Sequence, residues 1–92
     1  MNSIPTARDF IELPGFYLFK VIVKPEMVTV EELIAWTEHA LGRRIDETGI
    51  TSVASRNGGY RSYTLNLHME TYEEIEAVYA TYRNREGVMY VL

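Results

Sequence analysis

The sequence contains no cysteine, which excludes a disulfide framework and thiolate chemistry. Its apolar runs are short: residues 16–19 are followed at once by Lys20, whereas a helix that spans a bilayer needs about twenty apolar residues. Residues 1–5 lack the basic and apolar regions of a signal peptide. Together these absences predict a cytoplasmic protein with no membrane segment.

Basic residues are also scarce. Nine Lys and Arg against thirteen Asp and Glu leave a net charge of −4, which argues against capture of nucleic acid or of an anionic membrane surface. The 92 residues suffice for one globular core and not for two. We therefore expect a lead-in over residues 1–15, frayed over its first eight residues, and a single domain over residues 16–92.

The first half of the domain predicts a strand followed by a helix. Residues 16–23 alternate between two largely apolar faces, as a central strand does, and Pro25 follows them. The capping box formed by Thr29 and Glu32 then opens a helix that Gly42 ends. The core stripe of this helix is predicted from the 3.6-residue period to contain Val30, Leu33, Ile34, Thr37 and Leu41.

The second half predicts a hairpin, a helix and a last strand. Residues 50–55 form a polar edge strand, and Asn57-Gly58-Gly59 favours a turn whose two central positions take positive φ. Residues 60–69 alternate cleanly, and a second capping box opens at Thr71. The stripe of this second helix consists of Ile75, Val78, Tyr79 and Tyr82. Residues 88–92 form the closing strand.

The element order βαββαβ predicts the α+β class and the ferredoxin-like arrangement. Its antiparallel sheet has the strand order 4-1-3-2, and both helices cover one face. The two helical stripes and one face of residues 88–92 are expected to meet a set of strand residues in the core: Phe19, Val21, Val53, Tyr63, Leu65 and Leu67.

The helix-free face is the candidate interaction surface. By alternation it presents Leu18, Lys20, Ile22, Tyr60, Ser62, Thr64, Asn66 and His68. Such a face either docks a partner or a second copy of the chain, or is simply solvated. Trp36 lies on the border of the first helical stripe, where it either anchors a partner or seals the rim of the core.

Catalytic and metal-binding constellations are missing. No serine, threonine or lysine stands in a nucleophile motif, and no glycine loop can cradle a phosphate. His39 and His68 have no further ligands at metal-binding spacing, and the paired glutamates of both helix starts are explained by capping. We therefore expect neither an enzyme nor a cofactor or metal. RNA-recognition domains share this fold, but here Tyr60, Tyr90, Arg56 and Arg61 only faintly resemble their aromatic and basic surface.

Several segments, in this order and spacing, resemble the YbeD-like family of small uncharacterised bacterial proteins. They are Glu12-Leu13-Pro14 before the first strand, Ser55-Arg56-Asn57-Gly58-Gly59-Tyr60-Arg61-Ser62, Ile75-Glu76-Ala77-Val78-Tyr79 and Val88-Met89-Tyr90-Val91-Leu92. The resemblance implies a ferredoxin-like fold similar to ACT-type regulatory domains, no established reaction, and a link to lipoate transfer. ACT-type ligand sites use a glycine-containing turn after the first strand, where this chain has Lys24-Pro25-Glu26-Met27.

Three functions follow as hypotheses. The leading one is a non-enzymatic regulatory or protein-interaction domain that self-associates through its sheet or binds an unidentified protein partner. The alternative is an ACT-like module that binds an amino acid or a lipoyl-pathway effector. The third is an RNA-binding domain.

Overall fold

The computed structural model describes residues 11–92, so the predicted fraying of residues 1–8 lies outside the described residues. The chain runs through β1 (Gly15–Val23), α1 (Val30–Leu41), a 3₁₀ turn over Glu47–Gly49, β2 (Ile50–Ala54), β3 (Arg61–Met69), α2 (Tyr72–Arg83) and β4 (Val88–Val91). This is the predicted βαββαβ order, and the predicted element limits differ from it by one or two residues.

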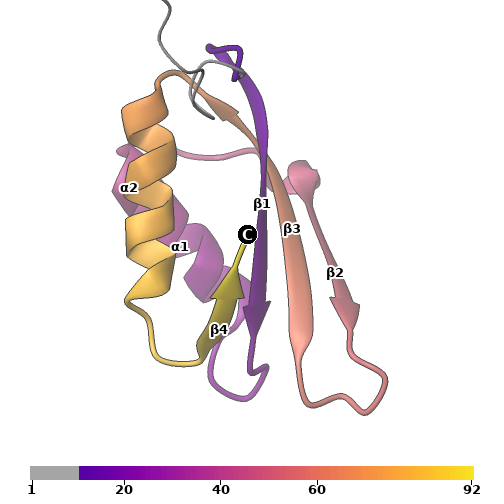
Figure 1. Ribbon diagram of the computed structural model, residues 1–92. Coiled ribbons are helices and arrows are strands. Elements are labelled where there is room, and N and C mark those ends of the chain that lie inside the picture. The colour runs from indigo at the N-terminus through magenta and orange to yellow at the C-terminus, as the bar shows by residue number, and fades with distance from the viewer. Residues whose placement is uncertain (1–10) are drawn as a thin grey trace, which may run out of the picture.

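The four strands form one antiparallel sheet in the order β2-β3-β1-β4, which is the predicted order 4-1-3-2. Both helices cover the same face of this sheet (Figure 1). β1 pairs with β3 over all nine of its residues, from Gly15 opposite Met69 to Val23 opposite Arg61. Because residues opposite each other point to the same side, this register assigns the side chains of both strands to one face or the other.

The core lies between the sheet and the helices. Its buried apolar members are Phe19, Val21, Val23, Val28, Leu33, Tyr63, Leu65, Leu67, Met69, Ile75, Val78 and Tyr82. Val53 was predicted for the core, and that prediction is wrong: its side chain is 71% exposed. Val53 pairs with Ser62, which pairs with Ile22, so all three point away from the helices.

The helix caps follow the sequence closely at α1 and less closely at α2. At α1, Thr29 accepts from the Glu32 amide and the Glu32 carboxylate accepts from the Thr29 amide, while Gly42 ends the helix with φ 70°. At α2, Thr71 accepts from the Glu74 amide as predicted. The Glu74 carboxylate turns elsewhere, because it accepts from the Glu70 amide and pairs with Arg43.

The hairpin between β2 and β3 differs from the prediction. Only Gly58 has positive φ, at 75°, and the loop is held by the Asn57 side chain, which accepts from the Gly59 amide, and by Ser55, whose hydroxyl accepts from the Tyr60 amide. The side-chain bonds of Asn57 and Ser55 stabilise a wider turn than the predicted two-residue one.

One polar pair is buried between the two helices. Thr37 of α1 donates its hydroxyl to the Leu33 carbonyl at 2.6 Å and is bonded to the hydroxyl of Tyr82 of α2. Since the Thr37 proton is used by Leu33, Tyr82 must be the donor to Thr37. Burial raises the pKa of Tyr82 to about 12, so its hydroxyl keeps that proton at neutral pH.

This pair predicts unequal effects for its two deletions. Tyr82→Phe removes one buried hydrogen bond and should lower the free energy of unfolding by about 1 kcal/mol. Thr37→Val leaves the Tyr82 hydroxyl buried without an acceptor and should cost about 2 kcal/mol, and adding Tyr82→Phe should recover part of that loss. Urea unfolding of the three variants measures this order, and equal losses for both single variants would contradict it.

Candidate interaction surface

The helix-free side of the sheet carries a contiguous surface that we call the open face. The sheet pairings place the following residues on it: Phe16, Leu18, Lys20, Ile22, Thr51, Val53, Tyr60, Ser62, Thr64, Asn66, His68, Tyr90 and Leu92. Every candidate residue predicted from the sequence lies here except Trp36. Sequence reasoning missed the contribution of the two outer strands, because only the pairing register shows which of their residues share this side.

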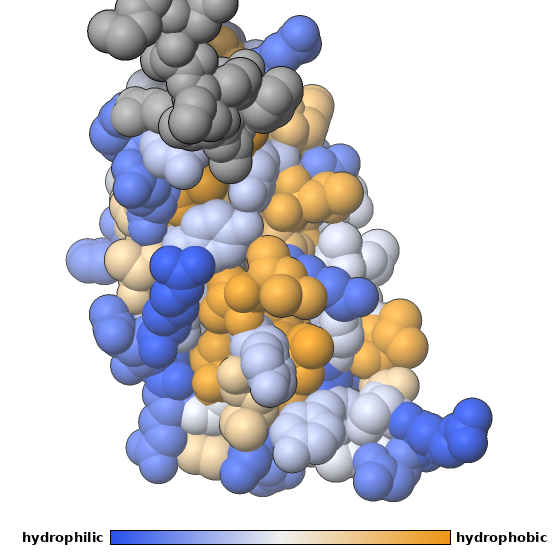
Figure 2. Space-filling view, viewed as in Figure 1, coloured by the Kyte–Doolittle hydropathy of each residue, from blue (hydrophilic) through white to orange (hydrophobic). Residues whose placement is uncertain are grey.

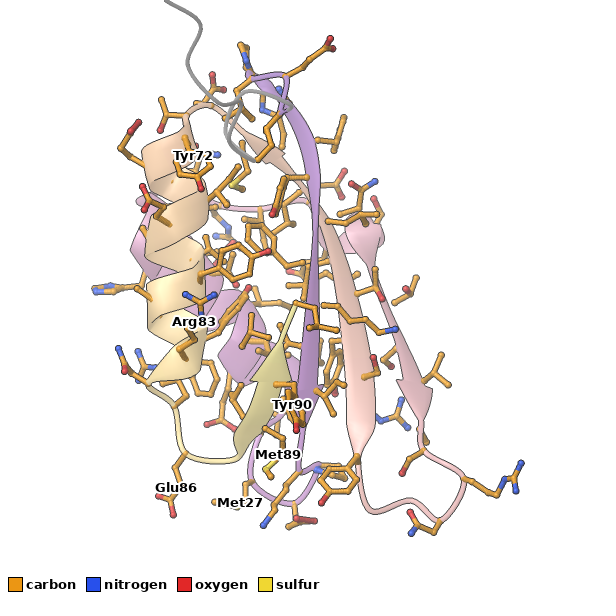
Figure 3. The ribbon with its side chains drawn as sticks, viewed as in Figure 1. Met27, Tyr72, Arg83, Glu86, Met89 and Tyr90 are labelled. Carbon is orange, nitrogen blue, oxygen red and sulfur yellow. The ribbon has the colours of Figure 1, made fainter. Side chains whose placement is uncertain are left out.

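Large apolar side chains are concentrated on the open face. Six of the eight exposed large hydrophobic residues between positions 11 and 92 belong to it, among them Phe16 and Leu18, which are 71% and 61% exposed, and Tyr90 at 66%. The other two, Met27 and Met89, lie at one end of the molecule near Glu86 (Figure 3). Hydrophobic surface gathers around the C-terminal strand and reappears over β2, while the helical side is largely hydrophilic (Figure 2). An apolar patch of this kind usually marks a binding surface.

The polar members of the open face lie along its centre and upper end. Lys20 is opposite Thr64 in the β1–β3 pairing. The His68 ring packs edge-on against Phe16, and its Nδ1 lies 3.5 Å from a carboxylate oxygen of Glu70. The single ammonium group of Lys20 is thus surrounded by hydroxyl and apolar side chains, as the sequence predicted.

A shallow hollow of about 380 Å³ lies over the lower half of the open face, between β1, β3 and β2. Lys20, Ile22, Val53 and Tyr60 contribute to its walls. The hydroxyl oxygen of Ser62, which also lines it, is buried and has no hydrogen-bond partner among the described residues. The hollow therefore combines apolar walls with an unsatisfied hydroxyl.

Trp36 belongs to the helical layer and not to the open face. It packs against the core together with Ala40, whereas Ile34, which was predicted for the core stripe of this helix, does not join the core cluster. The core-facing side of α1 is thus rotated toward Trp36 relative to the stripe that the sequence predicted. The guanidinium of Arg85 lies 4.8 Å from the centre of the indole ring, so the second residue after the end of α2 covers Trp36. These contacts support the rim-sealing role.

A second hollow, of about 480 Å³, lies beside the connection between α1 and β2. Arg43 forms one side of it by pairing with both carboxylate oxygens of Glu74 and donating to the His68 carbonyl at 2.9 Å. Arg44, whose side chain is 92% exposed, and the ring of Phe16 also line this hollow. We call the Arg43–Glu74 ion pair the clasp. The sequence contained no signal for it, because its two residues are about 30 positions apart.

The described residues contain no cluster of three or more histidine or acidic side chains that could hold a metal ion. Within the same part of the chain, no helix has the length and apolarity to cross a membrane. The open face thus gathers apolar and neutral polar side chains around Lys20, with His68 and Glu70 3.5 Å apart toward one end.

The Arg43–Glu74 clasp predicts a dependence of stability on pH. The bond from Arg43 holds the pKa of Glu74 below its ordinary value of 4.5, so the clasp stabilises the fold above that pH and is lost as Glu74 is protonated below it. Glu74→Gln should therefore lower the melting temperature most at pH 6–7, and the difference from the wild type should shrink below about pH 4.5. A difference that is constant from pH 7 to 3 in thermal melts would contradict this.

Comparison with known proteins supports the fold and leaves the activity open. A search of curated proteins finds no match. A solved structure, the solution structure of protein HP0495 from H. pylori, is similar with a TM-score of 0.74 and 15% identity, over 100% of this chain and 98% of that one. At this identity the similarity shows the fold alone. A family model described as a protein of unknown function, DUF493, matches residues 8–92. The chain therefore belongs to DUF493, the YbeD family that its sequence resembles.

Proposed function

We propose that this chain is a non-enzymatic, cytoplasmic protein-interaction module that self-associates through the open face of its sheet. The observation that carries the proposal is the concentration of exposed apolar side chains on that one face. Phe16, Leu18 and Val53 have no covering element among the described residues, and covering them would remove apolar surface from water.

The distribution of charge favours a second copy as the occupant. The net charge of −4 resides largely on the helical side, where both helices begin with glutamates. Among the described residues, the basic side chains on the open face are Lys20 and His68, and His68 lies beside Glu70. When two open faces pack together, the acidic helices lie on the outside of the dimer, where their mutual repulsion is weakest.

The size of the open face sets the strength of this contact. A nine-residue strand is about 30 Å long, and four strands spaced about 4.8 Å apart, two of them short, give an area on the order of 500 Å². Two copies then bury roughly 1,000 Å², which is at the low end for specific interfaces. We therefore expect a reversible dimer with a dissociation constant in the micromolar range or above.

A second candidate is the ACT-like effector module, which the 480 Å³ hollow supports. Arg44, which is largely exposed and forms a long ion pair of 3.9 Å with Glu38, could bind a ligand carboxylate there, and Phe16 offers an apolar wall. Thermal melts with free amino acids and lipoic acid test this function. A melting temperature that rises with ligand concentration, and does not rise in Arg44→Ala, would support it; no shift at millimolar ligand would exclude it.

Self-association is tested by sedimentation velocity from about 5 to 500 µM, a range that brackets the expected weak dimer. The wild type should shift from monomer to dimer, and Leu18→Glu should associate much more weakly because it places a carboxylate in the centre of the apolar contact. Ala35→Glu, which adds the same charge at an exposed position of α1, is the matched control and should dimerise like the wild type.

Two results would contradict the proposal. One is a wild type that stays monomeric throughout this range. The other is a dimer that Leu18→Glu and Lys20→Glu leave unchanged, because both substitutions alter the centre of the open face.

A further inference from the structure

We infer that the outer edge of β2 is a second contact, which pairs antiparallel with β2 of another copy in a register centred on Ser52. The inference rests on the proposed self-association and names an additional surface for it. It joins the sheets of two chains edge to edge, whereas the open face joins them face to face.

The direction of the backbone groups of β2 follows from one hydrogen bond. The Ser55 amide donates to the Tyr60 carbonyl at 2.8 Å, and the pairing of β2 with β3 continues from there without a register shift. Since bonded pairs alternate along an antiparallel ladder, Thr51 and Val53 also bond to β3. The amides and carbonyls of Ser52 and Ala54 must therefore point outward, and no hydrogen bond within residues 11–92 reaches them.

This edge lacks the protection that sheet edges usually carry. Ile50–Ala54 contains no charged residue and no proline, and its last four residues are exposed. Edge strands normally avoid pairing by means of lysine, proline or a bulge. The opposite edge, β4, does have an irregular register, between Ile22 and Val23 of its neighbour β1. The two edges of this sheet thus differ, and β2 is the one suited to strand addition.

The edge of β2 is complementary to itself. In a two-fold antiparallel register centred on Ser52, the two Ser52 residues exchange amide-to-carbonyl bonds. The Ala54 amide of each copy donates to the Ile50 carbonyl of the other. The Ile50 amide is not needed in this arrangement, because it already donates to the Glu47 carbonyl.

Charges at the two ends of β2 favour a second copy over an unrelated strand. Asp46 and Glu47 precede the strand, and Arg56 follows it. Antiparallel pairing brings the acidic end of one copy beside the arginine of the other, and symmetry repeats this at both ends. A parallel arrangement would instead place like charges together.

Pairing through β2 also enlarges the open face. In this register Val53 of one copy lies next to Thr51 of the other on the helix-free side, so two open faces become one continuous surface of about twice the area. An apolar surface of roughly 1,000 Å² per pair is sufficient for a stable face-to-face contact, which the single chain barely provides. The edge contact thus supports the assembly of four chains from two pairs.

The absence of cysteine makes a direct test available. In the proposed register the two Ser52 Cα atoms are about 5.5 Å apart, within the range of about 4.4–6.8 Å that a disulfide accepts. Ser52→Cys should therefore form a covalent dimer on mild oxidation. Ala35→Cys, an equally exposed position on α1, is the matched control and should not cross-link under the same conditions.

Charge exchange tests the register and the identity of the partner. Arg56→Glu should weaken association roughly fivefold, since it turns two attractive contacts into repulsive ones. Adding Glu47→Arg to the same chain should restore it. Both side chains are exposed, so circular dichroism should show an unchanged fold. Recovery in the double variant would not be expected if β2 bound an unrelated protein.

The outcomes separate this inference from the proposed function. If Leu18→Glu abolishes association in the wild-type background and Ser52→Cys fails to cross-link, self-association through the open face is supported and the β2 contact is refuted. If Ser52→Cys cross-links equally well with Leu18→Glu present, the β2 contact stands by itself. Failure of the charge exchange to restore Arg56→Glu would refute the centred register.

Discussion

The antiparallel pairing of β1 with β3 is the constraint on which the rest of this structure depends. Nine consecutive residue pairs form in a single register, without a bulge. Because side chains alternate from one residue to the next, this register directs Phe19 and Leu65 to the helices and Leu18 and Asn66 away from them. A slip of one residue would bury Lys20 and expose Phe19, so the core and the open face are specified by the same set of hydrogen bonds.

The two helices account for the asymmetry of the sheet. Each has twelve residues, is about 18 Å long, and is capped by a threonine, and both lie on the same side of the sheet. The chain between residues 11 and 92 has no further element for the other side, where Phe16, Leu18 and Val53 remain in contact with water. The acidic residues that favour the helix starts also place negative charge on the outer layer. The glutamates at the helix starts therefore also give the helical side of the molecule its negative charge.

The sequence predicted those features that depend on neighbouring residues. The capping box of Thr29 and Glu32, the ending at Gly42 and the alternation of β1 and β3 are local patterns, and the structure confirms them. The positions that differ depend on distant partners. Val53 points outward because it pairs with Ser62, and the Glu74 carboxylate leaves its cap because Arg43 reaches it from the connection that follows α1. Neither partner can be identified from spacing along the chain.

The same distinction applies to the candidate surface. The sequence by itself determined the element order, the two faces of the central strands and therefore most of the residues on the open face, since alternation with period 2 follows directly from strand geometry. Only the tertiary structure decided that Val53, Tyr90 and Leu92 join that face, that Trp36 is covered by Arg85, and that the backbone of Ser52 and Ala54 points to solvent. These features depend on the register between strands and on the packing of the segment after α2 against α1, and both arise from contacts between residues that lie far apart in the sequence.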